Sequence, residues 1–108
     1  MRVEPGVRGE ATTRVDDRQT AAAVGSGAVA SFSTPSLIAL MEAASINALT
    51  PYLDEGESSV GAEISVRHLA ATPIGYRVRA EAEVTAVDGK RVSLAVTAGG
   101  LLLCYMLA

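Results

Sequence analysis

The segment that decides the fold is residues 34–49, TPSLIALMEAASINAL, which has the length and composition of a helix of about four turns. The Thr34-Pro35 pair predicts its start, because a threonine hydroxyl can cap the first amides and proline is tolerated in the first turn. Thr50-Pro51 predicts its end, since the residue before a proline avoids helical backbone. A surface helix of this length carries a charged face, whereas Glu42 is the only charge here. We therefore predict a central, buried helix.

The rest of the sequence is dominated by an alternation of apolar and polar residues, which is typical of strands with one buried face. Strands are expected at residues 11–15 and 19–24, at 58–68, and at 76–86 and 92–98. Amphipathic strands of this kind form an antiparallel sheet with one face in solvent. The economical packing is a sheet curled around the helix, so that the helix covers its apolar face. The expected class is therefore α+β.

The loop between the last two strands can be assigned from the register of their apolar residues. These residues occupy even-numbered positions on both strands, so even positions must pair with even positions to share one face. A three-residue loop at 87–89 satisfies this condition and places Val84 opposite Val92. Gly89 then takes the left-handed position of a bulged hairpin loop.

Length and composition limit the class of protein. A chain of 108 residues allows a single domain, 1–108, in which we expect residues 1–10 to be frayed and 99–108 to form an atypical closing strand. A net charge of −3 disfavours nucleic acid as a partner. One cysteine and one histidine disfavour a metal site built from these residue types, and we expect no metal and no cofactor.

The cellular location is predicted from two features that we do not find, a signal peptide and an apolar run that could span a membrane. The first residues have no apolar core of the kind found in a signal peptide. The longest apolar run, residues 101–108, is too short to span a bilayer. We therefore expect a cytoplasmic protein with no membrane partner.

Packing alone does not explain why Glu42 and His68 occur where they do. A lone carboxylate is costly to bury unless it meets donors, so Glu42 is either a functional group or lies on the one solvated stripe of the helix. His68 is in phase with the apolar residues of the 58–68 strand, which directs its ring at the layer that the helix covers. A core or rim histidine bonded to a backbone carbonyl is the alternative.

Further positions have both a structural and a functional interpretation. Capping explains Thr34, although its hydroxyl also lies beside amides that favour negative charge. Gly61 marks either a bulge or the close approach of a ligand to the backbone. Cys104 is interpreted as a small hydrophobic residue. The outward arginines are solubilising residues or meet a phosphate; they are Arg67, Arg77, Arg79 and Arg91.

Three segments together resemble the hot-dog-fold thioesterases of the fluoroacetyl-CoA thioesterase type. They are residues 32–42, 56–61 and 68–75, with the sequences FSTPSLIALME, GESSVG and HLAATPIG. Their order and spacing agree with the family across residues 8–98. The resemblance implies a hot-dog fold, in which a curved antiparallel sheet wraps around one central helix. It also implies a homodimer with active sites at the subunit interface, and hydrolysis of a small acyl-CoA thioester.

The resemblance implies roles for individual residues as well. The family's catalytic threonine, glutamate and histidine fall on Thr34, Glu42 and His68. Its glycine near the substrate carbonyl falls on Gly61. The neighbouring positions that we expect to contact substrate are Val60 and Phe32.

The end of the chain differs from the family. Family members close with a strand of the pattern Gly-x-Gly-x-His-x-Arg, whereas Gly99-Gly100 is followed here by an apolar run. Two alternatives to a thioesterase therefore stay open: a non-catalytic module that binds acyl-CoA or a related thioester, and an impaired, truncated copy. The segment before the helix has no aromatic residue besides Phe32, so the sequence does not predict a lid that selects a fluorinated acyl group.

Overall fold

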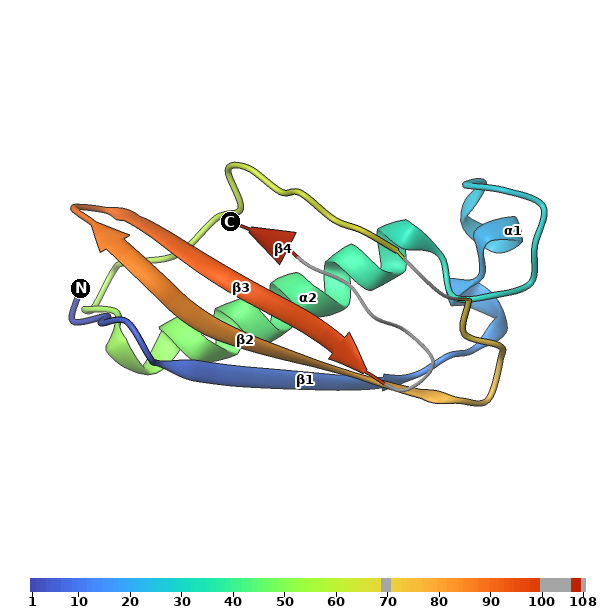
Figure 1. Cartoon of the computed structure of the whole chain (residues 1–108), viewed down its shortest axis with the longest axis horizontal. Helices are drawn as coiled ribbons and strands as arrows, with labels where there is room; N and C mark the ends of the chain where they lie inside the picture. The colour runs from blue at the N-terminus through green and yellow to red at the C-terminus, as the bar shows by residue number, and fades with distance from the viewer. Residues whose placement is uncertain (69–70, 100–105, 108) are drawn as a thin grey trace.

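The computed structural model describes residues 1–68, 71–99 and 106–107, and in them one sheet packs against one long helix (Figure 1). The strands are β1 (Arg8–Arg14), β2 (Arg77–Asp88), β3 (Arg91–Gly99) and β4 (Met106–Leu107). The helices are α1 (Ala21–Val24) and α2 (Thr34–Leu49), with 3-10 turns η1 (Asp17–Gln19) and η2 (Thr50–Tyr52). The described strands pair antiparallel in the order β1-β2-β3-β4. The α+β class and the antiparallel sheet are therefore confirmed.

The N-cap of α2 is Ser33 and not Thr34, so the predicted cap is wrong by one residue. The Ser33 hydroxyl accepts a hydrogen bond from the Ser36 amide at 3.1 Å, and Thr34 is already the first helical residue. Serine is at least as good a cap as threonine, and its use here releases the Thr34 hydroxyl from capping. The predicted end is confirmed, because α2 stops at Leu49 and passes into η2.

Only one face of α2 is buried in this chain. Leu37, Met41, Ala44 and Ala48 lie in the core formed with the sheet, whereas Ile46 is 47% exposed. The helix packs on the sheet as the predicted central helix, and its other face is uncovered in the isolated chain. The reason is that one sheet covers one side of a helix, while α2 is apolar on both. Among the described residues, no helix is long and apolar enough to cross a membrane.

The inner face of the sheet has the predicted alternation. From Val78 to Val84 on β2 and from Leu94 to Ala98 on β3, every second residue is buried, while the residues between them face outward or are only partly covered. This face and α2 enclose the core of the molecule. Its buried strand residues are Val78, Ala80, Ala82, Val84, Leu94, Val96 and Ala98.

The β2–β3 hairpin has a shorter loop than predicted. Asp88 pairs with Arg91, which leaves a loop of two residues, Gly89 and Lys90. Gly89 has a φ of +61°, as expected for its left-handed position. A hairpin loop of two residues requires such a conformation, and glycine adopts it without strain.

A bulge in β2 restores the register that the short loop would otherwise lose. Pairing shifts by one residue between Val84 and Ala86, so Val84 lies opposite Leu94 and not opposite Val92 as predicted. Beyond the bulge, even positions again pair with even positions, as the burial of apolar residues on one face demands. The extra residue therefore lies in the strand, at Thr85, and not in the loop.

Residues 1–10 are not frayed, in contrast to the prediction. β1 begins at Arg8, and before it the Gly6 amide donates to the Val84 carbonyl while the Val84 amide donates to the Val7 carbonyl, both at 2.8 Å. Val3 is buried in the core. These backbone bonds extend the pairing of β1 with β2, and the buried valine adds apolar contact, which explains why a polar segment is held.

Residues 21–24 form the short helix α1 and not the strand expected at 19–24. The Thr20 hydroxyl accepts from the Ala23 amide at 3.2 Å, and Gly25 ends the helix with a φ of +75°. Alanine has the highest helix propensity, and a cap and a left-handed glycine at this spacing define one helical turn. These local signals outweigh the weak alternation. The strand expected at 11–15 is present within β1, up to Arg14.

Residues 58–68 form no strand, which contradicts the prediction. The segment leads back along α2 towards the start of that helix (Figure 1). Val66 packs on the core, whereas Val60 is 87% exposed. A strand needs a neighbouring strand for its backbone hydrogen bonds, and no described strand pairs with this segment. Its alternating sequence therefore lies in unpaired backbone.

The predicted closing strand falls mostly outside the described residues. Met106 and Leu107 form β4 and pair with Val96 and Ala95 of β3. Cys104 lies outside the described residues, so its interpretation stays a prediction.

Candidate active site

A hydroxyl and an imidazole meet at the start of α2. Oγ1 of Thr34 lies 2.7 Å from Nδ1 of His68, which is half-buried. The contact is possible because Ser33 caps the helix and leaves the hydroxyl of the next residue available. With the ring proton on Nε2 the hydroxyl donates to Nδ1, and with the proton on Nδ1 the imidazole donates to the hydroxyl. The pair therefore orients the ring and couples its tautomer to Thr34.

Glu42 lies two turns further along α2 and faces the segment that contains Gly61. A Cβ atom added at Gly61 would lie 3.6 Å from Oε2 and 3.7 Å from Cδ of Glu42. The missing side chain thus leaves space in front of the carboxylate, next to exposed backbone. Among the described residues, the half-buried carboxylate of Glu42 has no hydrogen-bond or ion-pair partner. It is open to a ligand.

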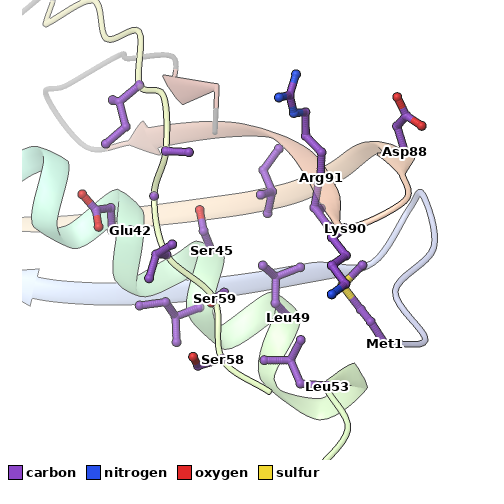
Figure 2. A pocket seen from close by; sticks show the side chains of 17 residues that line it. Met1, Glu42, Ser45, Leu49, Leu53, Ser58, Ser59, Asp88, Lys90 and Arg91 are labelled. Carbon is purple, nitrogen blue, oxygen red and sulfur yellow. The ribbon is translucent and has the colours of Figure 1, made fainter. Parts of the chain in front are cut away.

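Glu42 and Gly61 line a groove of about 1010 Å³ beside the C-terminal half of α2 (Figure 2). Its walls are α2, residues 58–64 and the β2–β3 hairpin. Figure 2 shows Glu42 at one end of the groove and Lys90 and Arg91 at the other. Between these ends the surface is largely apolar. The apolar lining includes Ile46, Leu49, Leu53, Val92 and Leu94.

The two other predicted substrate-binding residues lie in different environments. Val60 lines the groove next to Gly61, and its exposed side chain is accessible to a ligand. Phe32 is 1% exposed, belongs to the core and does not line the groove. Its amide donates to the Thr72 carbonyl at 2.8 Å, which holds the loop before α2. Phe32 therefore supports the position of Thr34 and does not face the groove.

The structure brings the predicted residues together as two pairs along one helix. Thr34 and Glu42 are eight positions apart, which corresponds to about 12 Å along the helix axis. The segment 61–68 passes alongside α2 and supplies a partner at each position. Gly61 lies against Glu42, and His68 binds Thr34. A substrate that lies along α2 can therefore meet both pairs.

Sequence reasoning missed two residues that line the groove. Ser45 follows Glu42 by three positions, which places it on the same helix face, and its hydroxyl donates to the Met41 carbonyl at 2.9 Å. Lys90 lies in the hairpin loop next to Gly89. The helical spacing from Glu42 is the signal that identifies Ser45. No sequence signal places Lys90 at the groove, because its position depends on how the hairpin folds over α2.

An ion cluster lies beside the hairpin end of the groove. The Met1 ammonium contacts Asp54 at 2.6 Å and Glu57 at 3.1 Å. Hydrogen bonding from this ammonium is the main cause that lowers the pKa of Asp54, and the Asp54 amide is the main cause that lowers the pKa of Glu57. The same two carboxylates raise the pKa of the Met1 ammonium. Arg2 lies 3.8 Å from Asp54 as well, so two cations balance the two carboxylates of this cluster.

The carboxylate of Glu42, the imidazole of His68 and the hydroxyl of Thr34 suit chemistry at an acyl carbon. A carboxylate can attack a thioester carbonyl or activate a water molecule, and an imidazole can carry the proton that the departing thiolate needs. A hydroxyl at a helix start lies where free amides favour developing negative charge. Within the part of the chain that the structure describes, no group of three histidine, cysteine or acidic residues could hold a metal ion.

An antiparallel sheet packed on one long helix is the architecture of hot-dog-like members of the thioesterase superfamily. A thioesterase superfamily member from Thermus thermophilus has a TM-score of 0.89 and 30% identity, over 99% of this chain and 82% of its own. A variant fluoroacetyl-CoA-specific thioesterase, solved with fluoroacetate and CoA, has a TM-score of 0.87 and 32% identity, over 98% of this chain and 94% of its own.

The family itself is identified by the sequence comparison. A family model for fluoroacetyl-CoA-specific thioesterases matches residues 15–100, and the chain belongs to this family. The fluoroacetyl-CoA thioesterase of Streptantibioticus cattleyicolor is 46% identical over 67 residues, which is 62% of this chain. The match covers 48% of that protein, so it spans about half the length of the curated relative.

Proposed function

We propose that this chain hydrolyses a small acyl-CoA thioester to the free acid and CoA. The observation that carries the proposal is the Thr34–His68 pair, whose side chains are 2.7 Å apart. Thr34 is on the same helix as Glu42, a half-buried carboxylate with no partner among the described residues. The comparisons support it, since the relatives are thioesterases and one was solved with fluoroacetate and CoA. The chain acts as one domain, 1–108, in the cytoplasm.

Each residue has a defined role in the proposed reaction. Glu42 attacks the thioester carbonyl or activates the water that does so. His68, held by Thr34, polarises the carbonyl or delivers the proton to the thiolate. Backbone at Gly61 stabilises the oxyanion, because no side chain keeps the substrate from approaching it. Val60 contacts the substrate in the groove, and Phe32 supports the site from the core.

The proposed working unit is a homodimer with its active sites at the subunit interface. The face of α2 that the sheet leaves uncovered includes exposed Ile46, and residues 58–64 add exposed Val60 and Ile64. The backbone of this segment also has no strand partner in the described chain. A second copy of this chain can cover both features, which burial of apolar surface favours.

The test measures the thiol that the Glu42→Gln variant releases from short acyl-CoAs. The Glu55→Gln variant is its control. Glu55 is exposed and does not line the groove, so its substitution makes the same chemical change away from the site. We expect turnover in the control and the loss of most turnover in Glu42→Gln and in His68→Ala, each with an unchanged melting curve. Wild-type rates in either site variant would refute the assigned roles.

The same experiment tests the two alternatives. A folded protein that releases no thiol from any acyl-CoA, but melts at higher temperature when the thioester is added, is a binding module. A protein with no cooperative melt is an impaired copy. A cooperative melt together with turnover that depends on Glu42 excludes both.

A further inference from the structure

We propose that the Ser45 hydroxyl positions the water molecule that attacks the thioester, and that Glu42 is the base that activates this water. This inference rests on the proposed function. It goes beyond that function by giving Ser45 a role and by choosing one of the two roles left open for Glu42. Ser45 acts through the water and does not itself bond to the acyl group.

Ser45 is a buried polar residue that lies beside the carboxylate of Glu42. Its exposed fraction is 7%, yet it lines the same groove as Glu42 (Figure 2). The two residues are three positions apart in α2, so they are neighbours on one helix face, with Cβ atoms about 5–6 Å apart. Alanine would favour the helix more than serine does, so helix stability does not explain a serine at this position.

The Ser45 hydroxyl offers only an acceptor to the groove. It donates its proton to the Met41 carbonyl, 2.9 Å away and one turn back in the helix. A hydroxyl has one proton and two lone pairs, so this oxygen can accept a further hydrogen bond but cannot donate one. The Glu42 carboxylate is also an acceptor and has no partner among the described residues. Two acceptors cannot bond to each other, so a donor has to lie between them.

Water is the smallest molecule that donates to both acceptors. Hydrogen bonds between oxygen atoms are about 2.7–2.8 Å long, so one water joins two oxygens roughly 5 Å apart, which suits side chains at this helical spacing. With both protons held, the lone pairs of the water are left for the acyl carbon. The backbone of Gly61 lies against the same carboxylate, because a Cβ added there would be 3.6 Å from Oε2 of Glu42. A thioester carbonyl bonded to this backbone is therefore next to the water.

The reaction then needs no bond between Glu42 and the acyl group. Glu42 takes one proton from the water while the water oxygen bonds to the acyl carbon. The electrons of the carbon–sulfur bond leave with the thiolate, which takes up a proton, and Glu42 releases the proton that it took. The products are the free acid and the thiol. Orienting the water before the reaction lowers the entropic cost of the attack.

The experiment compares three substitutions on α2. Ser45→Ala removes the hydroxyl, and Ser45→Thr keeps it. Ser36→Ala is the matched control, because Ser36 is on the same helix and does not line the groove. Values of kcat and KM are measured with the best wild-type substrate among acetyl-, propionyl- and butyryl-CoA, together with the melting temperature of each variant.

We expect Ser45→Ala to lower kcat by roughly tenfold with an unchanged KM, which corresponds to the loss of one hydrogen bond to the water. Its melting temperature should not fall, because alanine favours a helix and a serine bonded to the preceding turn does not. Ser45→Thr should keep most of the rate, and Ser36→Ala should match the wild type. A wild-type kcat in Ser45→Ala, or an equal fall in Ser36→Ala, would overturn the inference.

The origin of the oxygen in the product tests the water itself. A single turnover in water labelled with heavy oxygen should place the label in the free acid and none in the Glu42 carboxylate, as read by mass spectrometry of the peptide. Label in Glu42, or an acyl group found on Glu42, would show direct attack by the carboxylate and would contradict the proposed role of Ser45.

The wild type separates this inference from the proposed function. Wild-type turnover that Ser45→Ala leaves unchanged contradicts the role of Ser45 alone. A folded wild type that releases no thiol from any of these acyl-CoAs contradicts the thioesterase activity, and the role of Ser45 with it.

Discussion

The Thr34 hydroxyl lies 2.7 Å from Nδ1 of His68, although 34 positions separate the two residues in the chain. Thr34 is the first residue of α2, and His68 ends an extended segment with no strand partner in the described chain. The bond therefore ties this segment to the helix at the point where the proposed chemistry occurs. It also assigns the hydroxyl a role that is separate from helix stability.

Thr34→Val should impair turnover while leaving the fold intact. Valine has the shape of threonine but cannot hydrogen-bond, so the His68 ring loses its orientation. The loss of one such bond predicts a fall in kcat of roughly tenfold, whereas Thr34→Ser should retain most of the rate. Nitrogen NMR of the imidazole should show a changed tautomer balance in Thr34→Val only. An unchanged spectrum in that variant would show that the hydroxyl does not control the ring.

Ser33→Ala should have a large effect on stability, in contrast to Thr34→Val. Ser33 caps α2 through the Ser36 amide, so removing the Ser33 hydroxyl leaves that part-buried amide without this partner. The expected loss in the free energy of unfolding is about 1 kcal/mol, measured by urea denaturation. Ser33→Asp is the control, because aspartate is also a good cap. Equal stability of the alanine variant and the wild type would contradict the assignment of the cap.

Gly9→Ala should destabilise the fold strongly. A Cβ atom at this position would lie 2.3 Å from the Ala48 amide nitrogen and 2.6 Å from the Ala44 carbonyl oxygen, so β1 and α2 must move apart. We expect a loss of at least about 2 kcal/mol in the free energy of unfolding. Gly27→Ala is the matched control, since its Cβ would meet only the Ala21 side chain, at 3.5 Å. Similar melting temperatures for the two variants would show that the close approach is absent in solution.

Thr72→Val should increase stability or leave it unchanged. Thr72 is fully buried, and its hydroxyl has no hydrogen-bond partner among the described residues. An unpaired buried hydroxyl is costly, so an apolar side chain of the same shape should raise the free energy of unfolding by roughly 1 kcal/mol. Thr72→Ala is the control for the volume of the side chain and should be destabilising. A clear loss of stability in Thr72→Val would reveal a partner such as buried water.

Asp54 should titrate below the usual range of aspartate, because the Met1 ammonium donates a hydrogen bond to its carboxylate. A lowered pKa stabilises the fold above the pKa of the unfolded chain, and this contribution is lost as pH falls through the lowered value. The Met1 ammonium has a raised pKa, so its contribution is lost as pH rises through that value. NMR titration should give both directions, and Asp54→Asn should lower the pKa of Met1. An ordinary pKa for Asp54 would exclude the pair.

Several features of this protein follow from local sequence alone. Alternation on β2 and β3 identified the buried valines and alanines of the sheet, because side chains on a strand point alternately to its two faces. Pro51 also predicted the end of α2, because a proline restricts the backbone conformation of the residue before it. Parity of the apolar positions also predicted that Val84 would pair with an even-numbered residue, and its partner is Leu94.

Other features could not be chosen from the sequence pattern, because more than one structure satisfies that pattern. Either Ser33 or Thr34 can cap α2, and only the position of His68 reveals what the spare hydroxyl does. The extra residue of the hairpin can lie in the loop or at Thr85, and both satisfy the same pattern. Residues 58–68 alternate like a strand, but alternation does not supply a neighbouring strand.

The sequence by itself determined which residues of β2 and β3 are buried in the sheet and which groups have chemistry to offer. The tertiary structure decided which of them meet. Periodicity depends on backbone geometry within a few residues, so it can be recognised locally. The contacts of Thr34 with His68 and of Glu42 with Gly61 depend on the path of residues 58–68. The alternation within this segment does not specify where the segment packs.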